Sequence, residues 1–367
     1  MGTSTGRISS VGDGAIGLAC GHMRSMEYPA RLSPGDRVAI VSPSSGLPEI
    51  LPLPFELGLK RLKDDFGLIP VEYPTTRRMG SSPTDRAADI HAAFADPAIK
   101  AVISSIGGDD QITVLPHLDA ELLRANPKPF YGFSDCTSLL AYLADLGIVG
   151  YHGGAVMTAF GRPVSMHPLT EASLRAAMFD GGRYGLRESG DFSDMGRDWA
   201  DRATFDEAPQ MLPGTGWEWH GDRRVVTGTS WGGCLEVMAW MLMADRCIPA
   251  DVTGAILFFE TSEEMPTATE VYRILRSIGE RGMLAEAGAL LFGRPKAWSF
   301  DNQTDEAGRD AFVSEQRDAV LRAVGEYAPG LPVVLGIDIG HTDPQLILPY
   351  GGQITVDSVE RSIVVAY

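Results

Sequence analysis

The chain has 367 residues, of which 44% are hydrophobic and 22% are charged, and its formal net charge at pH 7 is −17. A chain of this length usually forms two domains and can bury a full core. The acidic balance disfavours nucleic acid as the main partner, because phosphate binding needs a basic surface. The sequence has no run of 18 apolar residues, so we expect no membrane span.

The beginning of the chain is rich in glycine and serine, and we expect residues 1–28 to form a disordered extension. Its one apolar patch, Ala15–Cys20, is too short for the hydrophobic part of a signal peptide. The cysteines show no CxxC spacing and no histidines at ligand spacing. They predict free thiols of a reducing compartment rather than a disulfide framework or a zinc site, and hence a cytoplasmic protein. The four are Cys20, Cys136, Cys234 and Cys247.

Strands and helices alternate through the first predicted domain, residues 29–178. Such alternation implies a parallel, doubly wound sheet that binds ligands at the carboxyl ends of its strands. The expected strands are Arg37–Ser42, Leu68–Tyr73, Lys100–Ile106 and Pro129–Phe133. The expected helices cover Pro54–Phe66, a stretch that begins at the capping residue Ser82, and a stretch that begins near Asp135.

Ser134 stands between the last of these strands and the helix that follows it, in Gly132-Phe133-Ser134-Asp135. A serine on so sharp a turn presents its hydroxyl above the sheet, and the helix start supplies free N–H groups, as in a nucleophile elbow. Cys136 replaces the usual second glycine of that motif. A Ser-Asp pair before a helix is also an ordinary N-cap, so the pattern alone leaves both interpretations open.

The alternation of predicted strands and helices stops in residues 179–225, which we interpret as a connecting segment with a long functional loop. Trp217 and Trp219 stand near its end. The second predicted domain, residues 226–367, resumes strands and helices. Helices are expected at Leu235–Met243, Thr267–Arg281 and Asp305–Val324, and strands at Ala255–Phe259, Ala289–Phe292 and Val333–Leu335, with further short strands in the tail.

A serine nucleophile needs a nearby base, and the base needs an orienting carboxylate. His341 follows a predicted strand in a glycine-flanked turn and is the first candidate for the base, with His152 as the second. Glu260 directly follows a buried apolar run, where an acid is unfavourable unless it is hydrogen-bonded. Ser134, Glu260 and His341 therefore form a candidate triad, although this order of residues also occurs in α/β-hydrolases.

Four motifs together resemble the LD-carboxypeptidase family of serine peptidases, which includes muramoyl-tetrapeptide carboxypeptidases and microcin C self-immunity proteins. These motifs are Gly107-Gly108, the elbow Gly132–Thr137, Phe258-Phe259-Glu260 and Gly340-His341. The resemblance implies an α/β fold, with an N-terminal flavodoxin-like parallel sheet domain and a C-terminal β-rich α/β domain. It also implies an active site between the domains with a Ser134–His341–Glu260 triad, no metal or other cofactor, and a homodimer.

Within the family, the chain looks closer to the microcin C immunity branch. The stretches that carry this likeness are Ile106–Asp110, Gly216–Trp219, Gly232–Glu236 and Glu260–Glu264. Two positions depart from that pattern, because Cys234 replaces an asparagine and Met265 replaces a lysine. The likeness predicts substrate contacts for Asp109, Trp217, Trp219 and Cys234.

We therefore expect Ser134 to attack an amide carbonyl while His341 takes its proton and Glu260 orients the imidazole. The main-chain N–H groups of Gly108 and Asp135 would form the oxyanion hole. The implied substrate is a small molecule, either an aminoacyl nucleotide analogue or a short peptide, and a tryptophan could stack on the adenine of the former.

Three alternatives stay open at this point. The first is a carboxypeptidase of murein recycling, which needs an arginine for the free carboxylate of its substrate. The second is a non-catalytic binding protein on the same scaffold, in which Ser134 is only a cap. The third uses Cys136 as the nucleophile, and it is disfavoured because this residue should lie inside the helix.

Overall fold

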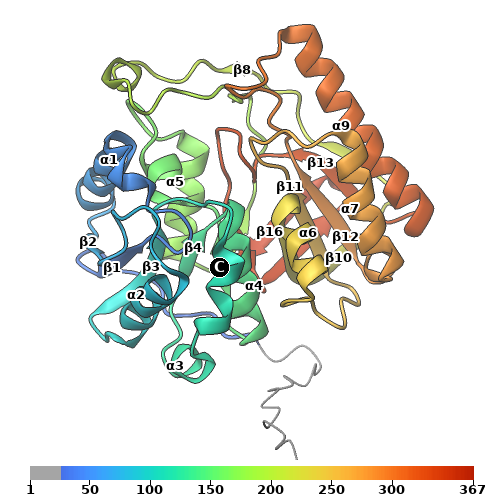
Figure 1. Ribbon diagram of the computed structural model, residues 1–367. Coiled ribbons are helices and arrows are strands. Elements are labelled where there is room, and N and C mark those ends of the chain that lie inside the picture. Colours follow the sequence, from blue (N-terminus) through green and yellow to red (C-terminus); the bar gives the residue numbers. More distant parts are fainter. Residues whose placement is uncertain (1–25) are drawn as a thin grey trace, which may run out of the picture.

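The computed structural model describes residues 26–367 as two sheets that lie side by side with helices around them (Figure 1). The expected extension, residues 1–28, lies outside the described residues except for its last three. Within those three, the N–H of Glu27 donates to the carbonyl of Gly147 at 2.8 Å. The hydroxyl of Tyr28 accepts from the N–H of Gln353 at 2.7 Å, so the described chain is tied to the fold from its start.

The first sheet has six strands. They are β1 (Arg37–Val41), β2 (Ile69–Glu72), β3 (Ile99–Ser104), β4 (Phe130–Gly132), β5 (Gly150–His152) and β14 (Leu348–Tyr350). Their spatial order is β2-β1-β3-β4-β5-β14, and β1 to β5 are all parallel. This is the flavodoxin-like order, in which ligands bind where the strand order reverses, outside β1 and β3. The expected parallel sheet is thereby confirmed.

The first four helices of this half connect the parallel strands, and the fifth follows β5. In chain order the helices are α1 (Pro52–Asp64), α2 (Pro83–Ala95), α3 (Ala120–Ala125), α4 (Thr137–Asp145) and α5 (Pro168–Arg175). The predicted start of α2 is confirmed, because the side chain of Ser82 accepts from the N–H of Asp85 at 3.1 Å. Strand β1 buries its last four residues, as expected for a strand covered on both faces.

The second sheet has eight strands in the order β6-β16-β15-β10-β11-β12-β13-β9. They are β6 (Arg183–Gly185), β9 (Glu218–His220), β10 (Val225–Cys234), β11 (Ile256–Glu260), β12 (Ala289–Gly293), β13 (Val333–Ile337), β15 (Gln353–Asp357) and β16 (Ser362–Ala366). Strands β10 to β13 are parallel, and the outer strands on both sides are antiparallel. This mixed sheet confirms a β-rich α/β second half.

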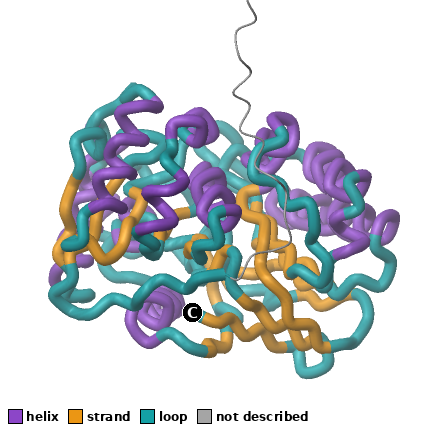
Figure 2. Tube along the Cα trace, turned by 90° about the horizontal axis from the view of Figure 1, so that it is seen from below, coloured by secondary structure: helices purple, strands orange, loops and turns teal. Residues whose placement is uncertain are grey.

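Four helices accompany the second sheet, and Figure 2 shows the helices of the molecule gathered mainly along one side of the strands. They are α6 (Leu235–Ala244), α7 (Ala268–Glu280), α8 (Met283–Glu286) and α9 (Glu306–Tyr327). A capping box at Thr267 and Glu270 fixes the start of α7. No helix among residues 26–367 has the length and apolar character needed to cross a bilayer.

Hydrogen bonding crosses the expected domain boundaries, although the division itself stays a prediction. Strand β14, from the second half of the sequence, pairs with β5 of the first sheet. Strands β6 and β9, from the expected connecting segment, join the second sheet. In the same segment β7 (Asp191–Phe192) pairs antiparallel with β8 (Leu212–Pro213) across a long loop, and β8 lies at the top of Figure 1.

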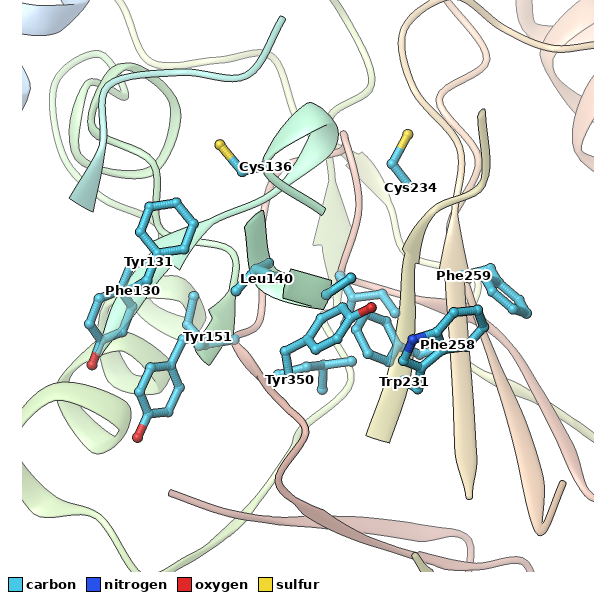
Figure 3. Close-up of a cluster of buried hydrophobic side chains, with 14 of the residues drawn as sticks. Phe130, Tyr131, Cys136, Leu140, Tyr151, Trp231, Cys234, Phe258, Phe259 and Tyr350 are labelled. Carbon is cyan, nitrogen blue, oxygen red and sulfur yellow. The ribbon is translucent and has the colours of Figure 1, made fainter. Parts of the chain in front are cut away.

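The hydrophobic core is continuous from one sheet to the other. Figure 3 shows Tyr350 of β14 between the aromatic side chains of the first sheet and Phe258 of the second. The rings of Tyr131 and Tyr151 stack with centroids 4.7 Å apart, and Phe258 contacts Tyr350 edge to face at 5.6 Å. Strand β14 therefore joins the cores of the two sheets, because it pairs with β5 and its Tyr350 contacts Phe258 of β11.

Candidate active site

A cavity of about 720 Å³ lies between the two halves. Its lining combines the carboxyl ends of the first sheet, the loop after β13, and the segment around β7 and β8. The residues used below are Ser134, Gly107, Gly108, Arg162, Arg197, Trp199, Glu263, Glu264, Lys296, Phe300 and His341. Ser134 and His341, predicted from opposite halves of the chain, thus face one cavity.

Ser134 occupies a sharp turn between β4 and α4. It begins the 3-10 turn Ser134–Cys136 with φ of 59°, a left-handed conformation that is uncommon outside glycine. A Cβ at Gly132 would lie 2.9 Å from both Cβ of Cys136 and Oγ of Ser104, so the turn closes only with glycine there. The strand–turn–helix geometry is that of a nucleophile elbow.

Cys136 points away from this chemistry. Its side chain is fully buried, and burial raises the pKa of the thiol to about 12. A thiol must ionise before it attacks a carbonyl, so this cysteine is inert at neutral pH.

His341 and Glu260 form a close pair. The Nδ1 of His341 lies 2.6 Å from Oε2 of Glu260, which ends β11 and is completely buried. Two glycines leave room for this carboxylate. A Cβ at Gly340 would lie 2.7 Å from Oε2 of Glu260, and a Cβ at Gly293 would lie 2.6 Å from its Cβ.

The surroundings of His341 favour its charged form. Burial alone would lower the pKa of the imidazole, but the nearby carboxylates of Glu260, Glu263 and Glu236 raise it to about 9. Within residues 26–367 its Nε2 has no hydrogen-bond partner, and Oε2 of Glu263 lies 3.3 Å away as an ion-pair contact. The hydroxyl of Ser134 is therefore not bonded to the imidazole in this conformation.

The glycine turn after β3 and the main-chain N–H of Asp135 lie beside the hydroxyl of Ser134. A Cβ at Gly107 would lie 3.1 Å from Oγ of Ser134 and 3.4 Å from the nitrogen of Asp135, so the glycine turn after β3 runs past the hydroxyl. Among residues 26–367 no backbone acceptor takes the N–H of Gly108. The N–H of Asp135 belongs to the first turn of a helix, where such groups lack helical partners.

The carboxylate of Asp135 holds this arrangement together. It is completely buried and accepts hydrogen bonds from the hydroxyl of Ser44, after β1, and from the N–H of Gln111 at 2.8 Å. A Cβ at Gly108 would collide with Oγ of Ser44. One buried acid thus links the ends of β1, β3 and β4. Burial raises the pKa of this carboxyl, although the two hydrogen bonds act to lower it.

His152, the second candidate for the base, bonds to the loop that carries His341. It is completely buried, and its Nε2 lies 3.0 Å from the carbonyl of Ile339, two residues before His341. Because a carbonyl only accepts, Nε2 carries the proton. Burial lowers the pKa of this imidazole, so it is neutral and joins β5 to the loop that carries His341.

The four residues expected to contact substrate do not line the cavity, and their roles stay predictions. Asp109 is exposed beside the glycine turn. Trp217 is buried, and its Nε1 donates to Asp338 at 3.4 Å. Trp219 lies on the edge strand β9, and Cys234 is buried with its N–H bonded to Oγ1 of Thr137 at 3.1 Å.

Other residues line the cavity instead of these four. Trp199 and Phe300 supply aromatic surface, and Arg162, Arg197 and Lys296 supply positive charge. The only sequence signal for Trp199 was its position as a large aromatic residue in the Gly-, Asp- and Arg-rich connecting segment. Among residues 26–367 no group of three or more His, Cys, Asp or Glu side chains is arranged to hold a metal ion.

We expect Gly340→Ala to lower kcat on the order of 100-fold, because even a small displacement of Glu260 misaligns the imidazole. The KM should change little, because the added Cβ lies against the side chain of Glu260 and the other residues of the cavity wall are unchanged. Steady-state kinetics on the purified variant measure both values. Gly325→Ala is the matched control, because a Cβ there meets nothing within 4 Å. Full activity of Gly340→Ala would contradict the role of the Glu260–His341 pair.

Comparisons with known proteins assign a family to this arrangement. A model described as the LD-carboxypeptidase N-terminal domain matches residues 38–153, and one described as the LD-carboxypeptidase C-terminal domain matches residues 227–356. A Treponema pallidum protein named "Putative carboxypeptidase" is 30% identical over 78% of this chain and 79% of its own length.

Other relatives carry two kinds of name. The murein tetrapeptide carboxypeptidase of Pseudomonas aeruginosa is 27% identical over 86% of this chain and 91% of its own length. The microcin C7 self-immunity protein MccF of Escherichia coli is 27% identical over 76% of this chain and 77% of its own length.

Solved structures agree with the fold. An MccF-like protein from Streptococcus pneumoniae, in complex with AMP, is 26% identical with a TM-score of 0.79, covering 91% of this chain and 99% of that chain. MccF in complex with aspartyl sulfamoyl adenosine has a TM-score of 0.80 at 23% identity, covering 92% of this chain and 98% of that chain. The chain therefore belongs to the LD-carboxypeptidase family of serine carboxypeptidase-type hydrolases, as its sequence motifs suggested.

Proposed function

We propose that the protein hydrolyses an amide-type bond through Ser134, His341 and Glu260, and that its substrate is an aminoacyl nucleotide analogue. The observation that carries the proposal is the 2.6 Å contact between His341 and Glu260 at a cavity that also contains the elbow serine. A nucleophile, a base and an orienting carboxylate in one cleft are the parts that acyl transfer requires.

In the proposed reaction, Oγ of Ser134 bonds to the acyl carbon while its proton passes to Nε2 of His341. The imidazolium, stabilised by Glu260, then gives that proton to the leaving nitrogen as the C–N bond breaks. Water attacks the resulting ester with the same histidine as base, which releases the acid and restores the serine. The tetrahedral oxyanion is stabilised by the N–H groups of Gly108 and Asp135, and each such donor contributes on the order of 3 kcal/mol.

The aromatic wall favours a nucleotide-linked substrate. Trp199 lines the cavity from the overlying segment and Phe300 lies at its rim, so a planar base can stack against either side chain. The solved relatives supply a precedent, since one is in complex with AMP and another with an aminoacyl sulfamoyl adenosine.

The positive charges of the cavity are partly engaged by the protein itself. The guanidinium of Arg162 is bonded to Asp343 and to the carbonyl of Ser165, each at 2.6 Å. That of Arg197 is bonded to two carbonyls of its own loop, one of them Glu207 at 2.9 Å. A murein-type carboxypeptidase needs a cation for the terminal carboxylate. Both guanidinium groups use part of their five donors on protein acceptors, and the ammonium of Lys296 uses one hydrogen bond to the carbonyl of Asp194.

We expect the purified protein to hydrolyse an aminoacyl sulfamoyl adenosine at least 10-fold more efficiently than a murein tetrapeptide. Liquid chromatography of both reactions gives kcat/KM for each substrate. A preference for the tetrapeptide would favour the murein function instead.

Stacking contributes roughly 1–3 kcal/mol, so Trp199→Ala should raise the KM for the nucleotide substrate roughly 5- to 150-fold. Trp219→Ala tests separately the prediction that Trp219 contacts the substrate, and an unchanged KM would contradict that prediction.

The homodimer that the family resemblance implies and the cytoplasmic location predicted from the sequence are part of this proposal. A non-catalytic binding function remains the alternative from another class. It would be supported by tight binding of both compounds without turnover of either.

A further inference from the structure

The carboxylate of Glu263 faces the cavity beside His341. Its side chain is 61% exposed, and its Oε2 lies 3.3 Å from Nε2 of His341. Within the described chain it makes no second ion pair, although Lys296 attracts it from farther away. An accessible negative charge with one partner therefore stands beside the atom that the proposed reaction uses as its base.

Glu263 differs from the other carboxylates around this imidazole. Glu260 is completely buried under His341. Glu236 is buried and accepts from the N–H and hydroxyl of Ser262 at 2.9 and 2.6 Å. Both are thus occupied by protein groups, whereas Glu263 is open to a ligand.

Glu263 is also charged at neutral pH. Its partial enclosure in the cleft would raise the pKa of the carboxyl, but His341 and Lys296 hold it below its usual value. As long as the carboxylate stays at Nε2, it stabilises the imidazolium and disfavours the neutral form that serves as base. A cation delivered by the substrate would take over this carboxylate and free the nitrogen.

The geometry of an acyl group at Ser134 indicates that this cation would lie close to Nε2 of His341. When Ser134 attacks, its oxygen lies within hydrogen-bond reach of Nε2 and bonds to the acyl carbon. In an aminoacyl group the α-nitrogen is only two bonds from that carbon. A carboxylate that reaches Nε2 of His341 therefore also lies within reach of the α-ammonium.

We propose that Glu263 is the binding site for the free α-ammonium of the substrate's acyl residue, and that it selects acyl groups whose amino group is unblocked. This inference rests on the proposed hydrolysis at Ser134 and narrows its substrate class. An aminoacyl nucleotide analogue carries a free ammonium at this position. In a tetrapeptide that loses its last residue, the corresponding nitrogen is part of a peptide bond and has no charge.

Binding to a protein that cannot turn over tests the inference separately from catalysis. The probes are an aminoacyl sulfamoyl adenosine and its N-acetyl analogue, and the proteins are Ser134→Ala and Ser134→Ala combined with Glu263→Gln. Calorimetry should show that Ser134→Ala binds the free-amine compound on the order of 10- to 100-fold more tightly, as for a hydrogen bond to a charged group. Glu263→Gln should bring the ratio of the two dissociation constants close to one.

Glu264→Gln is the matched control, because Glu264 lines the same cavity but forms no ion pair with His341. In the Ser134→Ala background it should keep the preference for the free amine. An unchanged preference with Glu263→Gln, an equal loss with Glu264→Gln, or no binding of either compound would overturn the inference.

Kinetics of the unmodified protein separate the two proposals. If it hydrolyses the N-acetyl analogue as efficiently as the free amine, the role of Glu263 is wrong and the hydrolase proposal stands. If Ser134→Ala shows the preference but the unmodified protein hydrolyses neither compound, the proposed function fails while the ammonium site stands.

Discussion

Ser134→Ala should lower kcat for hydrolysis of an aminoacyl sulfamoyl adenosine by up to about 10⁶-fold, the loss that follows removal of the nucleophile in another serine hydrolase. The reason is that alanine removes the hydroxyl oxygen that, in the proposed reaction, forms the acyl-enzyme. Initial rates by chromatography, taken at saturating substrate, measure the loss.

The fold should not change in this variant. The hydroxyl of Ser134 is not bonded to His341, and the buried links around it run through Asp135 instead. The denaturant midpoint of Ser134→Ala should therefore match that of the unmodified protein. Retained turnover in a folded variant would rule out Ser134 as the nucleophile.

Glu260→Gln should lower kcat about 10⁴-fold while leaving KM similar, by analogy with the effect of neutralising the acid of a serine-protease triad. The amide has nearly the shape of the carboxylate but cannot stabilise the imidazolium, and it favours the wrong tautomer of His341. Steady-state kinetics at several pH values measure this change.

The pH profile gives an independent readout of the same variant. The base must be neutral, so activity rises as pH passes through the pKa of His341, which is about 9 in this conformation. The charges that face this imidazole are Glu260, Glu263 and Glu236, with His152 neutral beneath it. Removing the charge of Glu260 lowers the pKa, so the acid limb of kcat/KM should move to lower pH.

Ser134→Ala combined with Glu260→Gln should lose no more activity than Ser134→Ala alone, because residues that act as one unit are not additive. A combined loss equal to the product of the two single losses would mean that the residues act independently. An unshifted pH profile in Glu260→Gln would likewise contradict a direct contact with the base.

Much of the fold follows from local patterns in the sequence. Strands β1, β3, β11 and β12 are short apolar runs buried on both faces, and the helices between them carry clear start signals, as at Ser82. Strand β10 was missed because glycines interrupt it. A Cβ at Gly232 would collide with the carbonyl of Phe258, so the glycine reflects a close approach of two strands that the sequence alone does not show.

Part of the candidate site was also predictable from local patterns in the sequence. Ser134 and His341 follow strands and Glu260 ends one, and each residue type suits its proposed task. The contact of Glu263 with His341, the anchoring by Asp135 and the position of Trp199 were not predictable. Each depends on the distance between segments far apart in the sequence, and no local pattern encodes that distance.

A fluorophosphonate probe tests most directly whether Ser134, His341 and Glu260 act as one unit, because it forms a covalent bond only with an activated serine. Intact-mass and peptide-mapping spectra should show one adduct, on Ser134, which is absent from Ser134→Ala and forms far more slowly in Glu260→Gln. An unlabelled protein, or an adduct at another residue, would contradict the account.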